Sequence, residues 1–215
     1  KIDGIEITKD MDYYPLLNKK VGKQVLVSIY NPDTKKRWEE IVKPISKGTQ
    51  NELLYQRWIK HNEEVVDSLS NGTLGYVHIR SMGDASYRDV YADILGKYNR
   101  RKGIVIDTRF NGGGRLHEDI EILFSGEKYL EQVIRDSVAC VMPSRRYVKP
   151  SIMIMCEANY SNAHGTPWVY KHKKMGKLVG MPVPGTMSSV TWETLQDTDL
   201  YFGLPVVGYR TQEGY

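Results

Sequence analysis

A serine stands where a buried strand gives way to a helix, in the stretch 151–167. Ile152–Cys156 is a continuous apolar run too short for a free-standing helix, which predicts a strand buried on both faces in a parallel sheet. Ser161 falls where the chain must turn, and Pro167 predicts the first turn of a helix over 168–175. This order presents a nucleophile at the carboxyl edge of a sheet, with a helix N-terminus that stabilises negative charge. The alternative is an ordinary strand-to-helix loop with a capping serine.

A second chemical signal is the glycine run in Phe110–Arg115, which lies between a predicted strand and a predicted helix over 116–124. Backbone N–H groups of such a loop can form an anion site. The dinucleotide pattern would need a glycine at His117, and the Gly-Lys-Ser/Thr of a P-loop is absent. The loop therefore suits an anion smaller than phosphate, unless it is simply a turn that needs positive φ.

The titratable residues near these loops are candidates for proton transfer. His164 follows the serine by three residues, and His78 and His117 fall near the predicted sheet edge. A structural or surface position at the helix start is the simpler interpretation of His164. Asp107 and Arg109 predict an ion pair at a strand end.

The elements that must position these residues form a βαβ pattern. A strand over 74–79, an amphipathic helix over 87–98 and a strand over 102–109 predict parallel pairing. A strand over 177–183 follows the serine stretch. The remaining segments, 190–195, 200–202 and 205–209, predict antiparallel strands. The fold class is therefore α/β.

Residues 1–45 predict a separate, incomplete module. A strand broken by an Asp-Gly turn, a short helix after Thr8 and a hairpin of 24–30 with 37–42 resemble the second half of a PDZ domain. Residues 46–72 predict a helical linker, and 73–215 predict the main domain. A generic helix and hairpin is the alternative for the first module.

Composition excludes several classes of function. The net charge of +4 comes from scattered basic residues, which argues against nucleic-acid binding, and no apolar run is long enough to span a membrane. Cys140 and Cys156 form neither a disulfide framework nor a metal site, and Cys156 fits a small core residue. We expect no cofactor and no metal.

The order of the motifs resembles a known family. The segments Gly75–Ile79, Ile106–Gly114, Glu157–Gly165 and Gly176–Thr186, after a PDZ-like half, are similar to the tricorn-like serine peptidases. These belong to the tail-specific, or C-terminal processing, peptidases. The resemblance covers nearly the whole chain and implies a catalytic core of the crotonase and ClpP type. It also implies that the core over 73–215 is incomplete at its C-terminal end.

The resemblance implies a role for each site residue. Ser161 would be the nucleophile, and the backbone N–H groups of Gly114 and Asn162 would form the oxyanion hole. Tricorn has an aspartate after its serine, but Asn162 retains the same backbone amide. The lysine base of the processing peptidases is replaced by Thr186, and tricorn's histidine and glutamate correspond to positions outside these 215 residues. Glu131 lies roughly where tricorn has an acidic group that selects basic side chains.

The resulting expectation is a serine endopeptidase that hydrolyses oligopeptides or unfolded polypeptide through an acyl-enzyme on Ser161. The present chain would be an inactive fragment without its general base, and the full protein would be a homo-oligomer. By analogy with tricorn the compartment is cytoplasmic, and a periplasmic one stays open. The rivals are an inactive peptide-binding module on the same fold and crotonase-like acyl-CoA chemistry, which would not require Ser161.

Overall fold

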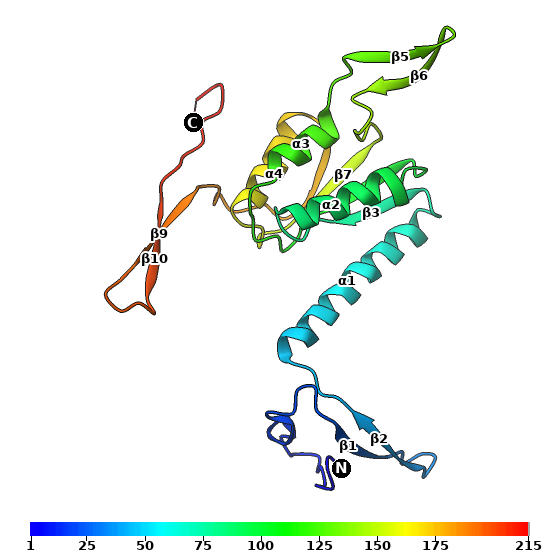
Figure 1. Ribbon diagram of the computed structural model, residues 1–215, viewed down its shortest axis with the longest axis vertical. Helices are drawn as coiled ribbons and strands as arrows, with labels where there is room; N and C mark the ends of the chain where they lie inside the picture. Colours follow the sequence, from blue (N-terminus) through cyan, green and yellow to red (C-terminus); the bar gives the residue numbers. More distant parts are fainter. Residues whose placement is uncertain (215) are drawn as a thin grey trace. The chain divides into compact units, whose positions relative to one another are not determined.

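The computed structural model describes residues 1–214. The chain divides into two compact units, Lys1–Lys60 and a second that begins at His61. The helix α1 (Lys47–Leu69) contains this boundary (Figure 1). It lies within the helical linker expected over 46–72, and the Ser46 hydroxyl accepts the Thr49 N–H at 3.0 Å, which caps its first turn.

The first unit is built on an antiparallel hairpin of β1 (Val25–Tyr30) and β2 (Arg37–Val42), as predicted. The predicted Asp-Gly turn is also confirmed, with Asp3 and Gly4 both at positive φ. The expected helix after Thr8 is wrong, because that segment holds only the 3₁₀ helix η1 (Tyr14–Leu17).

The second unit contains a parallel sheet with the strand order β3-β4-β7-β8, which confirms the α/β class. Its strands are β3 (Leu74–His78), β4 (Gly103–Asp107), β7 (Ser151–Met155) and β8 (Gly176–Gly180). The apolar run at Ile152 thus occupies an interior strand. Because the strands are parallel, their carboxyl ends meet at one edge, where the glycine loop and the serine turn both begin.

Helices cover one face of this sheet and bury a shared core (Figure 1). They are α2 (Asp84–Ala92), which continues into a π-helical turn η2 (Asp93–Lys97), α3 (His117–Ser125) and α4 (Asn162–His172). Alternate strand residues such as Ile104, Ile106 and Met153 point into the core, against Val90 and Leu123 of the helices. This packing holds the helix starts, and hence the loops before them, at fixed positions.

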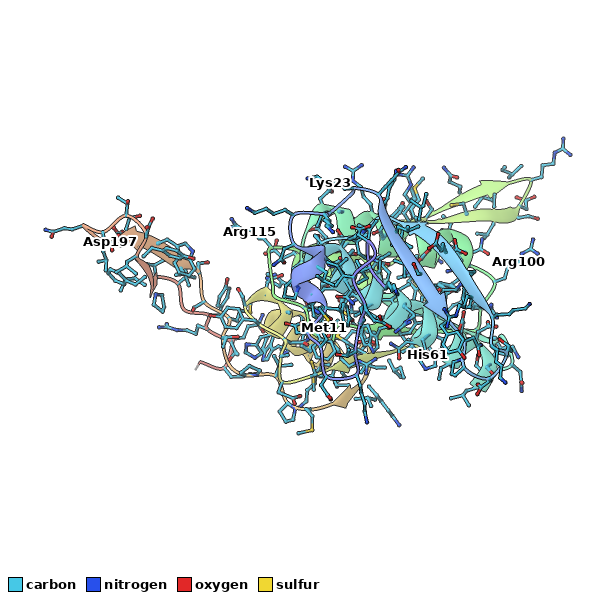
Figure 2. The ribbon with its side chains drawn as sticks, turned by 90° about the horizontal axis from the view of Figure 1, so that it is seen from below. Met11, Lys23, His61, Arg100, Arg115 and Asp197 are labelled. Carbon is cyan, nitrogen blue, oxygen red and sulfur yellow. The ribbon has the colours of Figure 1, made fainter. Side chains whose placement is uncertain are left out.

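Two hairpins complete the second unit. They pair β5 (Leu130–Ile134) with β6 (Ser137–Met142), and β9 (Val190–Thr194) with β10 (Tyr201–Pro205). The β5–β6 hairpin was not predicted from the sequence. Figure 2 labels Asp197, which lies in the turn between β9 and β10. The predicted third strand over 205–209 is wrong: residues 201–205 form β10, the Val206 N–H still donates to the Ser189 carbonyl at 2.8 Å, and residues 206–210 have no strand structure.

Within residues 1–214, no helix is both long enough and apolar enough to cross a bilayer.

Candidate active site

Ser161 lies at a strained turn between β7 and α4. Its backbone has φ 52° and ψ −123°, a conformation that residues with a side chain rarely adopt. Such strain costs on the order of 1–3 kcal/mol and persists only where neighbouring structure holds it. Here the Ser161 N–H donates to the Thr186 hydroxyl at 3.1 Å, and the Tyr160 N–H donates to the Asn111 carbonyl at 3.0 Å.

The helix after this turn begins at Asn162, five residues before Pro167, so the predicted start is wrong. A proline inside a helix leaves the carbonyl four residues earlier without its usual donor. That carbonyl belongs to Ala163, and the side-chain amide of Asn159 donates to it at 3.5 Å. Asn159 thus compensates for the proline, and the early start brings the first helical N–H groups next to the serine.

The glycine loop packs directly against the serine turn. A Cβ atom at Gly113, which has φ +97°, would lie 2.7 Å from the Ser161 Cβ and 2.8 Å from the Tyr160 carbonyl oxygen. A Cβ at Gly114, which has φ +141°, would collide with the Met82 carbonyl oxygen. Both positions therefore require glycine, for close approach as well as for backbone conformation.

Buried asparagines, which the sequence analysis missed, join the two loops. Asn111 is fully buried, and its amide donates to the Ile79 carbonyl at 2.7 Å and accepts the Gly113 N–H at 2.8 Å. Asn159, also fully buried, donates to the Thr108 hydroxyl at 2.9 Å. A signal was available, because asparagine in an otherwise apolar sheet-edge region needs partners for its amide.

The side chain of Asn162 reaches back to the start of α3. Its Oδ1 accepts the N–H groups of Leu116 at 2.9 Å and His117 at 3.1 Å, and its Nδ2 lies 2.7 Å from the His117 Nδ1. The residue beside the serine therefore fixes the end of the glycine loop as well.

Two backbone N–H groups at this site have no acceptor within residues 1–214. Asn162 is the first residue of α4, where helical geometry supplies no partner for its N–H. The Gly114 N–H is also unused, whereas that of Gly113 is taken by Asn111. Both free donors belong to residues that line one cavity with Ser161, so they can meet an anionic oxygen there.

This cavity has a volume of about 950 Å³. One wall comes from the glycine loop, the start of α3 and the serine turn; the other comes from the C-terminal segment. The lining residues include Arg115, Glu118 and Asp119 on the first wall and Met187, Trp192 and Tyr209 on the second. Arg115 is labelled in Figure 2.

Of the three candidate histidines, only His117 lines the cavity that contains Ser161. The Ser161 Oγ makes no hydrogen bond within residues 1–214, so none of the candidate histidines is paired with it. His164 lies in the first turn of α4 and is not among the cavity residues, and its Nδ1 is buried without a partner in this part of the chain. His78 ends β3 and does not line the cavity. His117 does line it.

The remaining predicted residues have clear positions. Thr186, where a lysine was considered, contacts the Ser161 N–H. The ion pair of Asp107 with Arg109 is confirmed, with 2.6 Å between the Asp107 Oδ2 and the Arg109 Nη2. The Asp107 side chain is fully buried. Glu131 lies on the exposed β5 strand, is paired with Lys128 and does not line the cavity.

At the carboxyl end of β3, burial disfavours the charged forms of His78 and Tyr76. Burial lowers the pKa of His78 to about 4, although the nearby Asp107 carboxylate acts to raise it. Burial also raises the pKa of the Tyr76 hydroxyl, which donates to Asp107 at 2.8 Å. His78 is therefore neutral near pH 7. No group of three or more candidate ligands in residues 1–214 could hold a metal ion.

Known proteins resemble this chain in sequence and in fold. Residues 73–215 match the profile of Peptidase family S41. The tricorn protease of Thermoplasma volcanium is 28% identical over 191 residues, which is 84% of this chain and 17% of that protein. A tricorn protease homolog of Saccharolobus solfataricus is 26% identical over 188 residues, or 83% of this chain and 16% of that protein.

The crystal structure of the tricorn protease superposes with a TM-score of 0.71 at 22% identity, covering 90% of this chain and 18% of that chain. The likeness therefore shows the mixed α/β fold with its parallel sheet. The chain spans less than a fifth of the length of these relatives.

Proposed function

The chain belongs to peptidase family S41, and on that premise we propose that it carries the nucleophile and the oxyanion hole of a serine endopeptidase. The observation that carries the proposal is the strained backbone of Ser161, held beside two unused N–H groups in one cavity. The peptidase relatives support a peptide substrate, either an oligopeptide or unfolded polypeptide.

The proposed reaction follows from these groups. The Ser161 Oγ attacks a peptide carbonyl, and the carbonyl oxygen becomes negatively charged. The N–H groups of Gly114 and Asn162 stabilise that charge, and loss of one such donor typically lowers the rate about 10²- to 10³-fold. The general base takes the Ser161 proton and gives it to the leaving amine, and water then hydrolyses the acyl-enzyme.

The general base is proposed to come from outside these 215 residues. A serine hydroxyl needs an aligned base, and within residues 1–214 no side chain accepts a hydrogen bond from the Ser161 Oγ. The much greater length of the relatives leaves room for such a group, either in a longer polypeptide or in another subunit of a homo-oligomer.

The proposed organisation keeps the boundaries set from sequence. Residues 1–45 are a partial PDZ-like module, supported by the β1–β2 hairpin. Residues 46–72 are a helical linker, supported by α1, and 73–215 are a catalytic core of the crotonase and ClpP type. The parallel sheet with helices on one face supports this type of core.

The test compares the full-length protein with its Ser161→Ala variant. Peptide turnover should fall by at least about 10⁴-fold, as for other serine nucleophiles, and labelling by a fluorophosphonate probe should disappear. Thermal unfolding serves as the control for folding. Near-normal turnover by a folded variant would refute the proposal, and a wild-type protein that binds peptides without turnover or labelling would favour an inactive binding module.

A further inference from the structure

The orientation of the Asn162 amide is fixed by the backbone around it. Its Oδ1 accepts two N–H groups, from Leu116 at 2.9 Å and from His117 at 3.1 Å. Reversing the amide would set its NH₂ group against both donors. The oxygen must therefore face the backbone, and the Nδ2 must face the His117 ring.

This orientation determines the tautomer of His117. The Asn162 Nδ2 lies 2.7 Å from the His117 Nδ1 and can only donate a hydrogen bond. The Nδ1 must then carry the lone pair, so the neutral ring carries its proton on Nε2.

The Nε2 atom is the part of the ring that remains available. Within residues 1–214 it has no hydrogen-bond partner. It is also not buried, so it is open to a ligand in the cavity. His117 lines the same cavity as Ser161 and Asn162. The charged groups that line it nearby are Arg115, Glu118 and Asp119, all from the same segment.

We propose that His117 is a substrate-positioning residue whose Nε2–H donates to a main-chain carbonyl oxygen of the bound peptide, with Asn162 setting its tautomer. In this form the Nε2 has no lone pair to offer, so His117 does not act as the general base. The role in substrate binding rests on the proposed function, whereas the tautomer stands independently of it.

The tautomer is tested on the 215-residue chain by ¹⁵N–¹H long-range NMR at pH 7, with the His117 signals assigned by their loss in His117→Gln. We expect the neutral Nε2–H form. In Asn162→Asp a carboxylate keeps both backbone bonds but faces Nδ1 with an oxygen, so Nδ1 should gain a proton. A wild-type ring with its proton on Nδ1 would overturn the inference whether or not the variant folds.

The binding role is tested by peptide turnover in the full-length protein. His117→Phe should raise KM about 3- to 10-fold, the range for one hydrogen bond, with a smaller change in kcat. His117→Gln keeps a donor and should recover much of the loss. An unchanged KM in His117→Phe, or a collapse of kcat alone, would overturn this role. Retained turnover in Ser161→Ala would instead overturn the proposed function and leave the tautomer result in place.

Discussion

The two walls of the cavity are built in different ways. The wall with the glycine loop and the serine turn is held by buried side chains, and Asn111 and Asn159 are both fully buried. The C-terminal wall includes a hairpin whose aromatic residues are open to solvent, with Trp192 64% and Tyr201 66% exposed. The groups proposed for chemistry are therefore fixed by buried contacts within this chain, whereas the opposite wall is exposed and has little packing of its own.

The largest effect expected from this contrast concerns matched glycines. Gly113→Ala places a methyl group 2.7 Å from the Ser161 Cβ and should lower turnover by about 10²-fold or more, because small misplacements of reacting groups are that costly. Gly208→Ala, on the C-terminal wall, meets nothing within 4 Å and should stay within about twofold. Kinetics of the two full-length variants, normalised to folded protein, make the comparison. Equal losses of turnover in the two variants would contradict the proposed difference between the two walls.

The next effect concerns stability. Asn111→Ala leaves the Ile79 carbonyl and the Gly113 N–H without partners and should destabilise the protein by roughly 2–4 kcal/mol. Trp192→Ala removes an exposed ring that packs edge-on against Tyr201 and should cost less than about 1 kcal/mol. Urea unfolding measures both. A larger loss for Trp192→Ala would show that the hairpin is a structural element of the core.

A third, smaller effect is the pH dependence of stability that His78 contributes at the end of β3, outside the cavity. The pKa of its buried ring is lowered to about 4, so below about pH 6.5 the unfolded chain binds a proton that the folded chain does not. Its contribution is complete above that pH and is lost as the pH falls towards 4, by at most about 3 kcal/mol. Urea unfolding between pH 7 and 4.5 should show a shallower decline in His78→Gln. His61→Gln, at an exposed position of α1, controls for the substitution; equal slopes in all three proteins would contradict this account.

The sequence predicted the elements with strong periodicity but not the contacts between them. The sheet strands, α3 and the β1–β2 hairpin follow from apolar runs and turn residues, which act locally. The start of α4 was missed because the usual rule places proline in the first turn, and only the folded chain brings the Asn159 amide to the carbonyl that Pro167 leaves free. The position of Thr186 beside Ser161 likewise depends on residues 25 apart in sequence.

The candidate site was predictable to a similar extent. The serine turn and the glycine loop were visible as motifs, and the structure brings Ser161, Gly114 and Asn162 to one cavity. The roles of the asparagine side chains could not be predicted, because an amide gives no periodic signal and its partners lie on other elements. The catalytic roles themselves stay predictions.

The central claim is that this chain holds an assembled nucleophile and oxyanion hole but takes its base from elsewhere. The most direct measurement is fluorophosphonate labelling of the 215-residue chain and of the full-length protein, followed by mass spectrometry of the labelled residue. We expect stoichiometric labelling of Ser161 in the full-length protein and none in the folded 215-residue chain. Robust labelling of the 215-residue chain that is abolished by His164→Ala would contradict the account, because it would show that the base lies within these residues.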